Sequence, residues 1–250
     1  MEEDAVTMTG LGGRRVLITG AAQRLGAVIA RAFAERGAAV IVHYCQSKEE
    51  AAELAASLPP CPAPLHHETF SCDLADPDAV RRMAETLGPV DFLVNNAAMW
   101  IRGDAPRSEL DRQEAVNHLA PRELIRLFSA HRPDGREFSA VNILDAAVLS
   151  GSAPATPYAA AKAALLRDTK TLALELAPHV RVNAVAPGPV FAPRELGEAG
   201  MKRTPGTLPL KRQVSPEDVA RAVVFLASAP SVTGAVLPVD CGQSLLPPQT

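Results

Sequence analysis

Two side chains that can transfer a proton lie four residues apart, Tyr158 and Lys162, and Asp145 lies thirteen residues before the tyrosine. The preceding Thr156-Pro157 is typical of a helix N-cap followed by the first helical residue. We therefore expect Tyr158 in the opening turn of a helix, with Lys162 on the same face. A nearby ammonium and the positive end of a helix both favour a phenolate. The spacing predicts a Tyr158 pKa below the usual value of about 10 and a role in proton transfer.

The elements that position these residues follow from the hydrophobic pattern. Short apolar runs alternate with helical patterns almost to the C-terminus, which is typical of the α/β class, with a parallel sheet covered by helices. Strands are expected at residues 15–19, 39–43, 65–71, 91–95, 138–144, 180–186 and 235–239. Helix starts are expected at Ser47, Asp76, Ser108, Thr156 and Ser215, each followed by proline or, three residues on, by an acid.

Length and charge limit the classes of function. A chain of 250 residues with a net charge of −3 suits one domain, which we expect at residues 13–250 after a flexible tail at residues 1–12. There is no basic field for nucleic acid or an anionic membrane, so a small-molecule partner is expected. The four cysteines form no C-x-x-C pair, which favours free thiols and no metal site. An acidic start and no long apolar run favour a cytoplasmic protein without a membrane span.

Ligands of open α/β sheets bind beyond the carboxyl ends of the strands, so the residues there are the most informative. The first expected strand runs into Thr19-Gly20-Ala21-Ala22-Gln23-Arg24-Leu25-Gly26 and then a helix. Backbone N–H groups and a helix N-terminus in such a turn can bind a pyrophosphate. We therefore expect Gly20, Arg24, Leu25 and Gly26 to bind a dinucleotide. The alternative is an ordinary tight turn.

The second expected strand ends in His43-Tyr44-Cys45-Gln46-Ser47-Lys48. An NAD site would place a carboxylate near this point for the ribose 2′-hydroxyl, and none is present. Arg24, Ser47 and Lys48 could instead surround the 2′-phosphate of NADP, because an anion needs donors and positive charge. The alternative is that Ser47 only caps a helix and Lys48 is solvated.

The ordered set of motifs resembles the short-chain dehydrogenase/reductase family over residues 14–246. The resemblance rests on the glycine turn, Asn95-Asn96-Ala97 after the fourth strand, Asn117, the Tyr158/Lys162 pair and Pro187-Gly188 after the sixth strand. It implies a doubly wound Rossmann fold with a seven-stranded parallel sheet and helices on both faces. It also implies hydride transfer at a nicotinamide near Pro187-Gly188, cofactor contacts from Asn96 and Ala97, and commonly a homotetramer.

Two departures from the general family pattern narrow the resemblance. Arg24 stands where most members have a third glycine, and Asp145 stands where they have a catalytic serine. Both are similar to pteridine reductases, including the bacterial dihydromonapterin reductases, and His43-Tyr44 with Ser47 resembles the NADP segment of that subgroup. The resemblance implies NADPH-dependent reduction of a C=N bond in a dihydropterin or dihydrofolate. It also implies that Trp100 stacks on the substrate, the alternative being a packing residue.

The resemblance implies further roles. Tyr158 would donate the proton, replenished from Asp145 or from water reached through Lys162 and Asn117, and Lys162 would also hold the nicotinamide ribose. Considered singly, Asp145 could be a turn residue at a strand end and Asn117 a helix residue bonded to backbone.

Adenine recognition is implied for Asp73 with Leu74 after the third strand. The alternative for Asp73 is to cap the turn at Asp76.

Two further features leave the activity open. Residues 187–209 are rich in proline and glycine and suit a lid over a ligand or an ordinary surface loop. Within them Ala192 stands where the family usually has a threonine that binds the nicotinamide amide. Three classes remain open: a pterin reductase, a reductase of a ketone or sugar carbonyl, and a non-enzymatic NADP-binding sensor.

Overall fold

The computed structural model describes residues 10–149, 155–191 and 205–246, and these form a seven-stranded parallel sheet. The strands lie in the order β3-β2-β1-β4-β5-β6-β7, as the doubly wound fold requires. Their bounds are β1 Arg15–Ile18, β2 Ala39–Tyr44, β3 Glu68–Ser71, β4 Phe92–Asn95, β5 Phe138–Ile143, β6 Val180–Pro187 and β7 Val236–Val239. Each expected strand is present, so the predicted fold class is confirmed.

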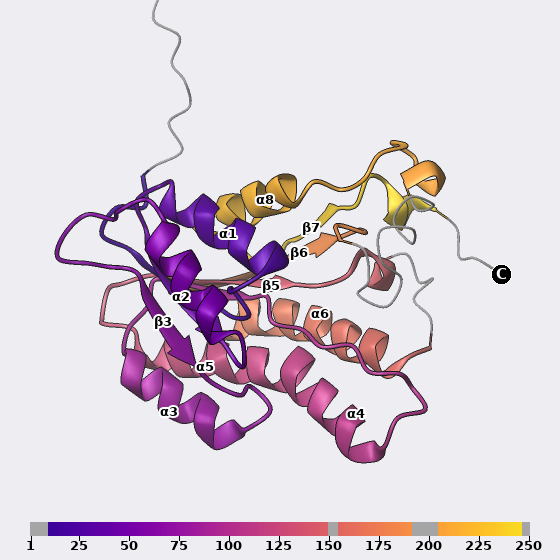
Figure 1. Ribbon diagram of the computed structural model, residues 1–250, viewed down its shortest axis with the longest axis horizontal. Coiled ribbons are helices and arrows are strands. Elements are labelled where there is room, and N and C mark those ends of the chain that lie inside the picture. The colour runs from indigo at the N-terminus through magenta and orange to yellow at the C-terminus, as the bar shows by residue number, and fades with distance from the viewer. Residues whose placement is uncertain (1–9, 150–154, 192–204, 247–250) are drawn as a thin grey trace, which may run out of the picture.

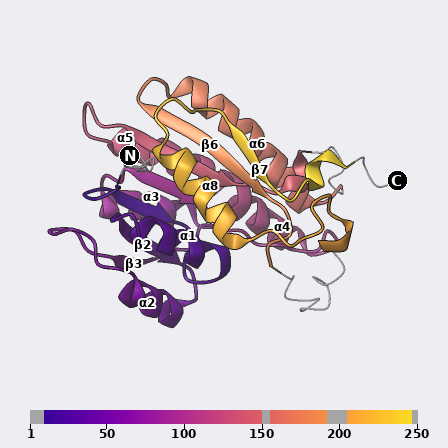
Figure 2. The same cartoon turned by 90° about the horizontal axis from the view of Figure 1, so that it is seen from above.

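Helices cover both faces of the sheet (Figure 1). They are α1 Arg24–Ala34, α2 Lys48–Ser57, α3 Pro77–Leu87, α4 Arg107–Glu114, α5 Ala120–His131, α6 Pro157–Glu175 and α8 Pro216–Ser228. Figure 2 shows α1 and α8 lying side by side over one face, while α3, α5 and α6 pack on the other. A π-helical turn, Ala115–Leu119, joins α4 to α5. No helix in the described ranges is long and apolar enough to cross a bilayer.

Three of the five expected helix starts are capped as predicted. The side chains of Asp76, Thr156 and Ser215 accept hydrogen bonds from first-turn N–H groups of α3, α6 and α8. The other two differ. Ser47 precedes α2, but its hydroxyl makes no capping bond. Helix α4 begins at Arg107, so Pro106 is its N-cap and Ser108 lies within its first turn.

Two expected boundaries were wrong. Strand β3 begins at Glu68 and not at residue 65, because the His67 ring accepts the Val40 N–H that a neighbouring strand would otherwise pair. The folded part also begins before residue 13: Leu11 is buried in the core and its N–H donates to the Arg36 carbonyl at 2.7 Å.

The buried faces of the strands are mostly valine, isoleucine, leucine and alanine, as a sheet covered on both sides requires. One core layer lies between the sheet and α1, α2 and α8, and the other lies under α3, α5 and α6. The chain changes direction across the sheet between β1 and β4. At that switch point, the carboxyl ends of the strands leave a crevice in which ligands of this fold bind.

Candidate functional site

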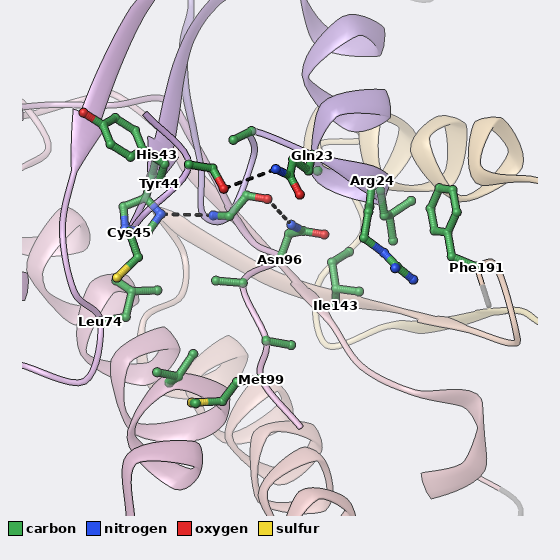
Figure 3. Close-up of a pocket in the computed structure, with 18 of the residues that line it drawn as sticks. Gln23, Arg24, His43, Tyr44, Cys45, Leu74, Asn96, Met99, Ile143 and Phe191 are labelled. Atoms are coloured by element: carbon green, nitrogen blue, oxygen red, sulfur yellow. Dashed lines mark hydrogen bonds between the residues drawn. The ribbon is translucent and has the colours of Figure 1, made fainter. Parts of the chain in front are cut away.

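A cavity of about 740 Å³ occupies this crevice (Figure 3). Loops after β1 to β6 supply its walls. Of the site residues predicted from sequence, all line the cavity except Lys48, Asn117 and Trp100. The cavity wall has two regions that carry charged side chains. The β3 side consists of Asp73, Leu74 and Arg112, and the β5 side consists of Asp145, Tyr158 and Lys162.

The glycine turn between β1 and α1 is shaped to leave backbone exposed. Gly20 has a φ of +61°, which favours glycine. A Cβ on Gly26 would lie 2.3 Å from the Gly20 carbonyl oxygen, so no side chain fits there. Gln23, at the N-cap of α1, makes no side-chain capping bond. The N-terminus of α1 lines the cavity through Arg24, Leu25 and Gly26, an arrangement that fits the pyrophosphate of a dinucleotide.

Asn96 braces this turn against β4. Its Nδ2 donates to the carbonyls of Thr19 and Gly20 at 2.9 and 3.1 Å. The Thr19 hydroxyl in turn accepts the N–H groups of Asn96 and Ala97. The predicted contact residues thus shape the turn as well as line the cavity.

His43 supports the turn as a neutral ring. Its Nδ1 accepts the Gly20 N–H at 3.0 Å, so Nε2 carries the proton and donates to the Cys72 carbonyl at 3.1 Å. Burial lowers the pKa of His43 to about 4, although the bond to Cys72 opposes that shift. The ring therefore joins the ends of β1, β2 and β3 and supplies no positive charge.

Arg24 lines the cavity, but its guanidinium lies against Phe191. Its φ is +53°, uncommon for a residue with a side chain, and its guanidinium lies 5.0 Å from the centre of the Phe191 ring. Figure 3 shows it pointing away from His43 and Tyr44 and toward Phe191, beyond β6. The Ser47 hydroxyl lines the cavity and accepts Gln23 Nε2 at 3.3 Å, whereas Lys48 is exposed and does not line it.

The β5 side brings Asp145, Tyr158 and Lys162 together, as predicted. Lys162 is 2% exposed, and its Nζ donates to the Ile143 carbonyl at 2.8 Å. The same Nζ lies 5.9 Å from the centre of the Tyr158 ring. Burial lowers the Lys162 pKa to about 8, and the charge of Asp145 opposes this shift.

The predicted acidification of Tyr158 was wrong for this site. Burial raises the Tyr158 pKa above its usual value, and Asp145 raises it further. Desolvation disfavours the phenolate, and a neighbouring carboxylate repels it. Tyr158 therefore stays protonated at neutral pH, the state that a proton donor needs.

Asp145 also fills the turn role that the sequence left open. One carboxylate oxygen, Oδ1, accepts the Ala147 N–H at 2.8 Å. A second cavity of about 310 Å³ adjoins the first and shares Asp145 and Gly188 with it. Pro189, Leu208 and Gln243 are among its other lining residues.

Asn117 holds the loop after β4. Its Oδ1 accepts the Met99 N–H at 2.9 Å, and its Nδ2 donates to the Met99 carbonyl at 2.7 Å. Gln113, one turn earlier, accepts the Ile101 N–H at 2.5 Å. Trp100 lies between these two anchored residues and is 54% exposed. The Asn117 side chain is thus bonded to backbone, the alternative left open by the sequence.

The β3 side contains an ion pair that the sequence did not predict. Arg112 on α4 donates to Asp73 Oδ2 at 2.7 Å, and Asp73 Oδ1 accepts the Ala75 N–H at 3.0 Å. Arg112, Gln23 and Phe191 also line the cavity and were not singled out. Gln23 stood within the glycine turn, but neither Arg112 nor Phe191 belongs to a motif, so no sequence signal marked them. Asp73 also caps the turn before Asp76, the alternative left open by the sequence, because its carbonyl accepts the Asp76 N–H at 3.0 Å.

Two predictions concern residues 192–204. One is that Ala192 replaces a threonine that binds the nicotinamide amide, and the other is that residues 187–209, most of which fall in this range, suit a lid over the ligand. Both lie outside the described residues. In the described ranges, no three His, Cys, Asp or Glu side chains gather as a metal site would require.

Comparison with known proteins yields relatives along almost the whole chain. The profile of a family described as enoyl-(acyl carrier protein) reductase matches residues 20–244. The 3-oxoacyl-(acyl-carrier-protein) reductase of Thermotoga maritima is 33% identical over 244 residues, covering 93% of this chain and 98% of the relative. Pteridine reductase 1 of Leishmania tarentolae is 33% identical over 278 residues, covering 92% of this chain and 96% of the relative.

A solved structure is also similar. It is FolM alternative dihydrofolate reductase 1 from Brucella canis, complexed with NADP, with a TM-score of 0.83 and 29% sequence identity. The match covers 95% of this chain and 96% of that one.

Proposed function

The chain belongs to the short-chain dehydrogenase/reductase family of oxidoreductases, and we propose that it is an NADPH-dependent reductase of a C=N bond in a dihydropterin or dihydrofolate. One observation carries the proposal: Asp145, Tyr158 and Lys162 line the same cavity as the glycine turn, at the carboxyl edge of the sheet. Proton-transfer groups and an anion site thus face one enclosed space.

NADPH is the proposed cofactor. Gly20 and Gly26 leave room for a pyrophosphate, and the first turn of α1 offers N–H groups to it. No carboxylate lies in the segment from His43 to Lys48 at the end of β2, and Ser47 lines the cavity there. The similar Brucella canis structure contains NADP. When bound, the nicotinamide supplies the hydride.

Tyr158 is the proposed proton donor. Its phenol is protonated at neutral pH, so it can protonate the nitrogen that gains negative charge as the carbon is reduced. Lys162 is within reach of the ring and would hold the nicotinamide ribose. Asp145 or water would return the lost proton. Both polar atoms of the Asn117 side chain are bonded to the Met99 backbone. A proton path from Lys162 to water near Asn117 would therefore run through backbone groups.

A pterin suits Asp145 better than a simple ketone does. Its Oδ1 is bonded to Ala147, and the other oxygen can accept N–H groups from the amidine-like edge of a pterin. The adjoining cavity of about 310 Å³ beside Asp145 is within the size range of small-ligand pockets. The relatives include a pteridine reductase and an alternative dihydrofolate reductase. Trp100 remains the proposed stacking residue, although it does not line the cavity formed by the described residues.

The second candidate is reduction of a ketone or sugar carbonyl. It is supported by the relative that acts as a 3-oxoacyl-(acyl-carrier-protein) reductase and by the exposure of Trp100. A non-enzymatic NADP-binding sensor has less support, because such a protein has no need of Tyr158 beside the buried Lys162.

NADPH oxidation separates these candidates. The purified protein is assayed with dihydrobiopterin, dihydrofolate and a panel of ketones and sugars. We expect pterin or folate turnover. Ketone turnover without pterin turnover would favour the second candidate, and tight NADPH binding without any turnover would favour the sensor.

We also propose a homotetramer, as is common in this family. Leu119 and Leu174, on the π-turn and α6, are 47% and 83% exposed, which suits a subunit contact. Light scattering on the purified protein gives the mass, and a monomer would refute this assembly.

A further inference from the structure

We infer that Arg112 is an adenine-binding residue, whose guanidinium stacks on the base at the β3 side of the cavity while Asp73 fixes its plane. This inference rests on the proposed NADPH cofactor.

The position of the base follows from the fold. In doubly wound sheets the pyrophosphate lies at the turn after β1, and the adenosine ribose lies at the end of β2. In the strand order, β3 is the edge strand beside β2, so its carboxyl end lies next to the adenosine ribose. Asp73 and Leu74 follow β3 and line the cavity, so the base must lie against them.

Arg112 reaches this place from the neighbouring helix. It lies on α4, and its guanidinium donates to Asp73 Oδ2 at 2.7 Å. The Arg112 side chain remains 44% exposed while lining the cavity. Val116, one helical turn further along, lines the same cavity. The helix therefore presents a flat cation and an apolar side chain to one space.

Stability does not account for the ion pair. Asp73 is 38% exposed, and partners so exposed to water typically contribute little to folding. The pair does fix orientation: Asp73 Oδ1 is held by the Ala75 N–H, which leaves Oδ2 aimed at Arg112. The guanidinium plane is thus set before a ligand arrives.

The chemistry of arginine suits an adenine face. A guanidinium is planar and weakly hydrated, and it stacks on aromatic rings, including the bases of nucleic acids. Asp73 is a positioning residue for Arg112, because Oδ1 is held by the Ala75 N–H while Oδ2 accepts the guanidinium.

The test compares three ligands that share adenine: NADPH, NADH and 2′,5′-ADP. Binding is measured by titration calorimetry for the wild type, Arg112→Leu and Arg112→Lys. Arg107→Leu is the matched control, since Arg107 also lies on α4 and pairs with an acid, Asp111, but does not line the cavity. Thermal unfolding of each variant establishes that it is folded.

We expect Arg112→Leu to raise the Kd of all three ligands by a similar factor of roughly three to ten, the effect of a partly exposed cation–π contact. Arg112→Lys should lose most of that affinity, because it keeps the charge but not the plane. Arg107→Leu should bind like the wild type.

Three results would overturn the inference. Weakening confined to NADPH and 2′,5′-ADP would assign Arg112 to the 2′-phosphate. Unchanged binding in Arg112→Leu would remove it from the cofactor site. Wild-type affinity in Arg112→Lys would exclude stacking. Failure of the wild type to bind NADPH would instead refute the proposed cofactor.

Discussion

The two sides of the cavity use charge in opposite ways. On the β5 side, Lys162 is 2% exposed, and burial shifts the pKa values of Lys162 and Tyr158. On the β3 side, Arg112 and Asp73 are 44% and 38% exposed and form an ion pair across the cavity wall. Desolvation tunes proton affinity on one side. On the β3 side, hydrogen bonding sets the orientation of the Arg112 guanidinium, which stays in contact with water. Chemistry and recognition are therefore separated along one ligand site.

The largest expected effect tests whether proton transfer is confined to the β5 side. Tyr158→Phe removes the only group proposed to donate the proton, so kcat should fall by at least ~10²-fold. NADPH affinity, measured by fluorescence titration, should remain nearly intact. An unchanged turnover rate would reject Tyr158 as the acid.

The next effect tests the turn that connects the two sides. In Gly26→Ala the new Cβ would lie 2.3 Å from the Gly20 carbonyl, so the turn must shift. We expect the NADPH Kd to rise more than about tenfold, the loss of roughly 1.4 kcal/mol of binding. Gly10→Ala is the control, because its Cβ would meet only the Arg36 carbonyl at 4.0 Å. Equal affinities in both variants would contradict this role of the turn.

A pH profile tests the tuning of the β5 side. The Lys162 pKa is about 8, so its ammonium is lost as pH rises through 8, and kcat/KM should fall there. Asp145 opposes the burial shift by raising the Lys162 pKa. Asp145→Asn should therefore move the falling limb below pH 8. A limb that stays in place, or moves upward, would separate Lys162 from the profile.

A smaller effect tests the loop next to the β5 side. Gln113 is fully buried, and its Nε2 has no hydrogen-bond partner among the described residues, which costs stability. Gln113→Leu removes this unpaired Nε2, which favours the folded state, but it also leaves the Ile101 N–H without its acceptor. Because the two effects oppose each other, the free energy of unfolding should change by no more than about 1 kcal/mol.

The same variant should change the fluorescence of Trp100, the only tryptophan in the chain, because one anchor of its loop is gone. KM for the substrate should rise more than kcat falls. Unchanged Trp100 emission and KM would mean that Gln113 does not position the loop.

The smallest effect tests the β3 side. Asp73→Asn breaks an exposed ion pair, so the unfolding free energy measured in urea should drop by less than about 1 kcal/mol. A much larger loss would mean that the pair stabilises the fold, and the contrast between the two sides would fail.

Local sequence signals predicted most of the fold. Asp76, Thr156 and Ser215 cap helices because a capping bond joins residues two or three apart. Ser47 matched the same pattern, yet its hydroxyl accepts Gln23 from another loop instead. A cap motif cannot reveal a competing partner that is distant in the sequence.

The sequence predicted which residues line the candidate site better than it predicted where their side chains point. Every cofactor residue expected from the motifs except Lys48 lines the cavity, because strand ends of a parallel sheet meet at one edge. Arg24 lies on that edge but points toward Phe191, and Arg112 lies there without a motif. Side-chain direction depends on neighbours that pattern and spacing do not encode.

The sequence alone determined the order of strands and helices, the need for glycine at positions 20 and 26, and the joint presence of Asp145, Tyr158 and Lys162 at one sheet edge. Only the tertiary structure decided that burial raises the Tyr158 pKa and lowers that of Lys162, and that Asp73 binds Arg112. Periodicity and capping act between near neighbours in the chain, whereas desolvation and ion pairing depend on residues brought together from distant segments.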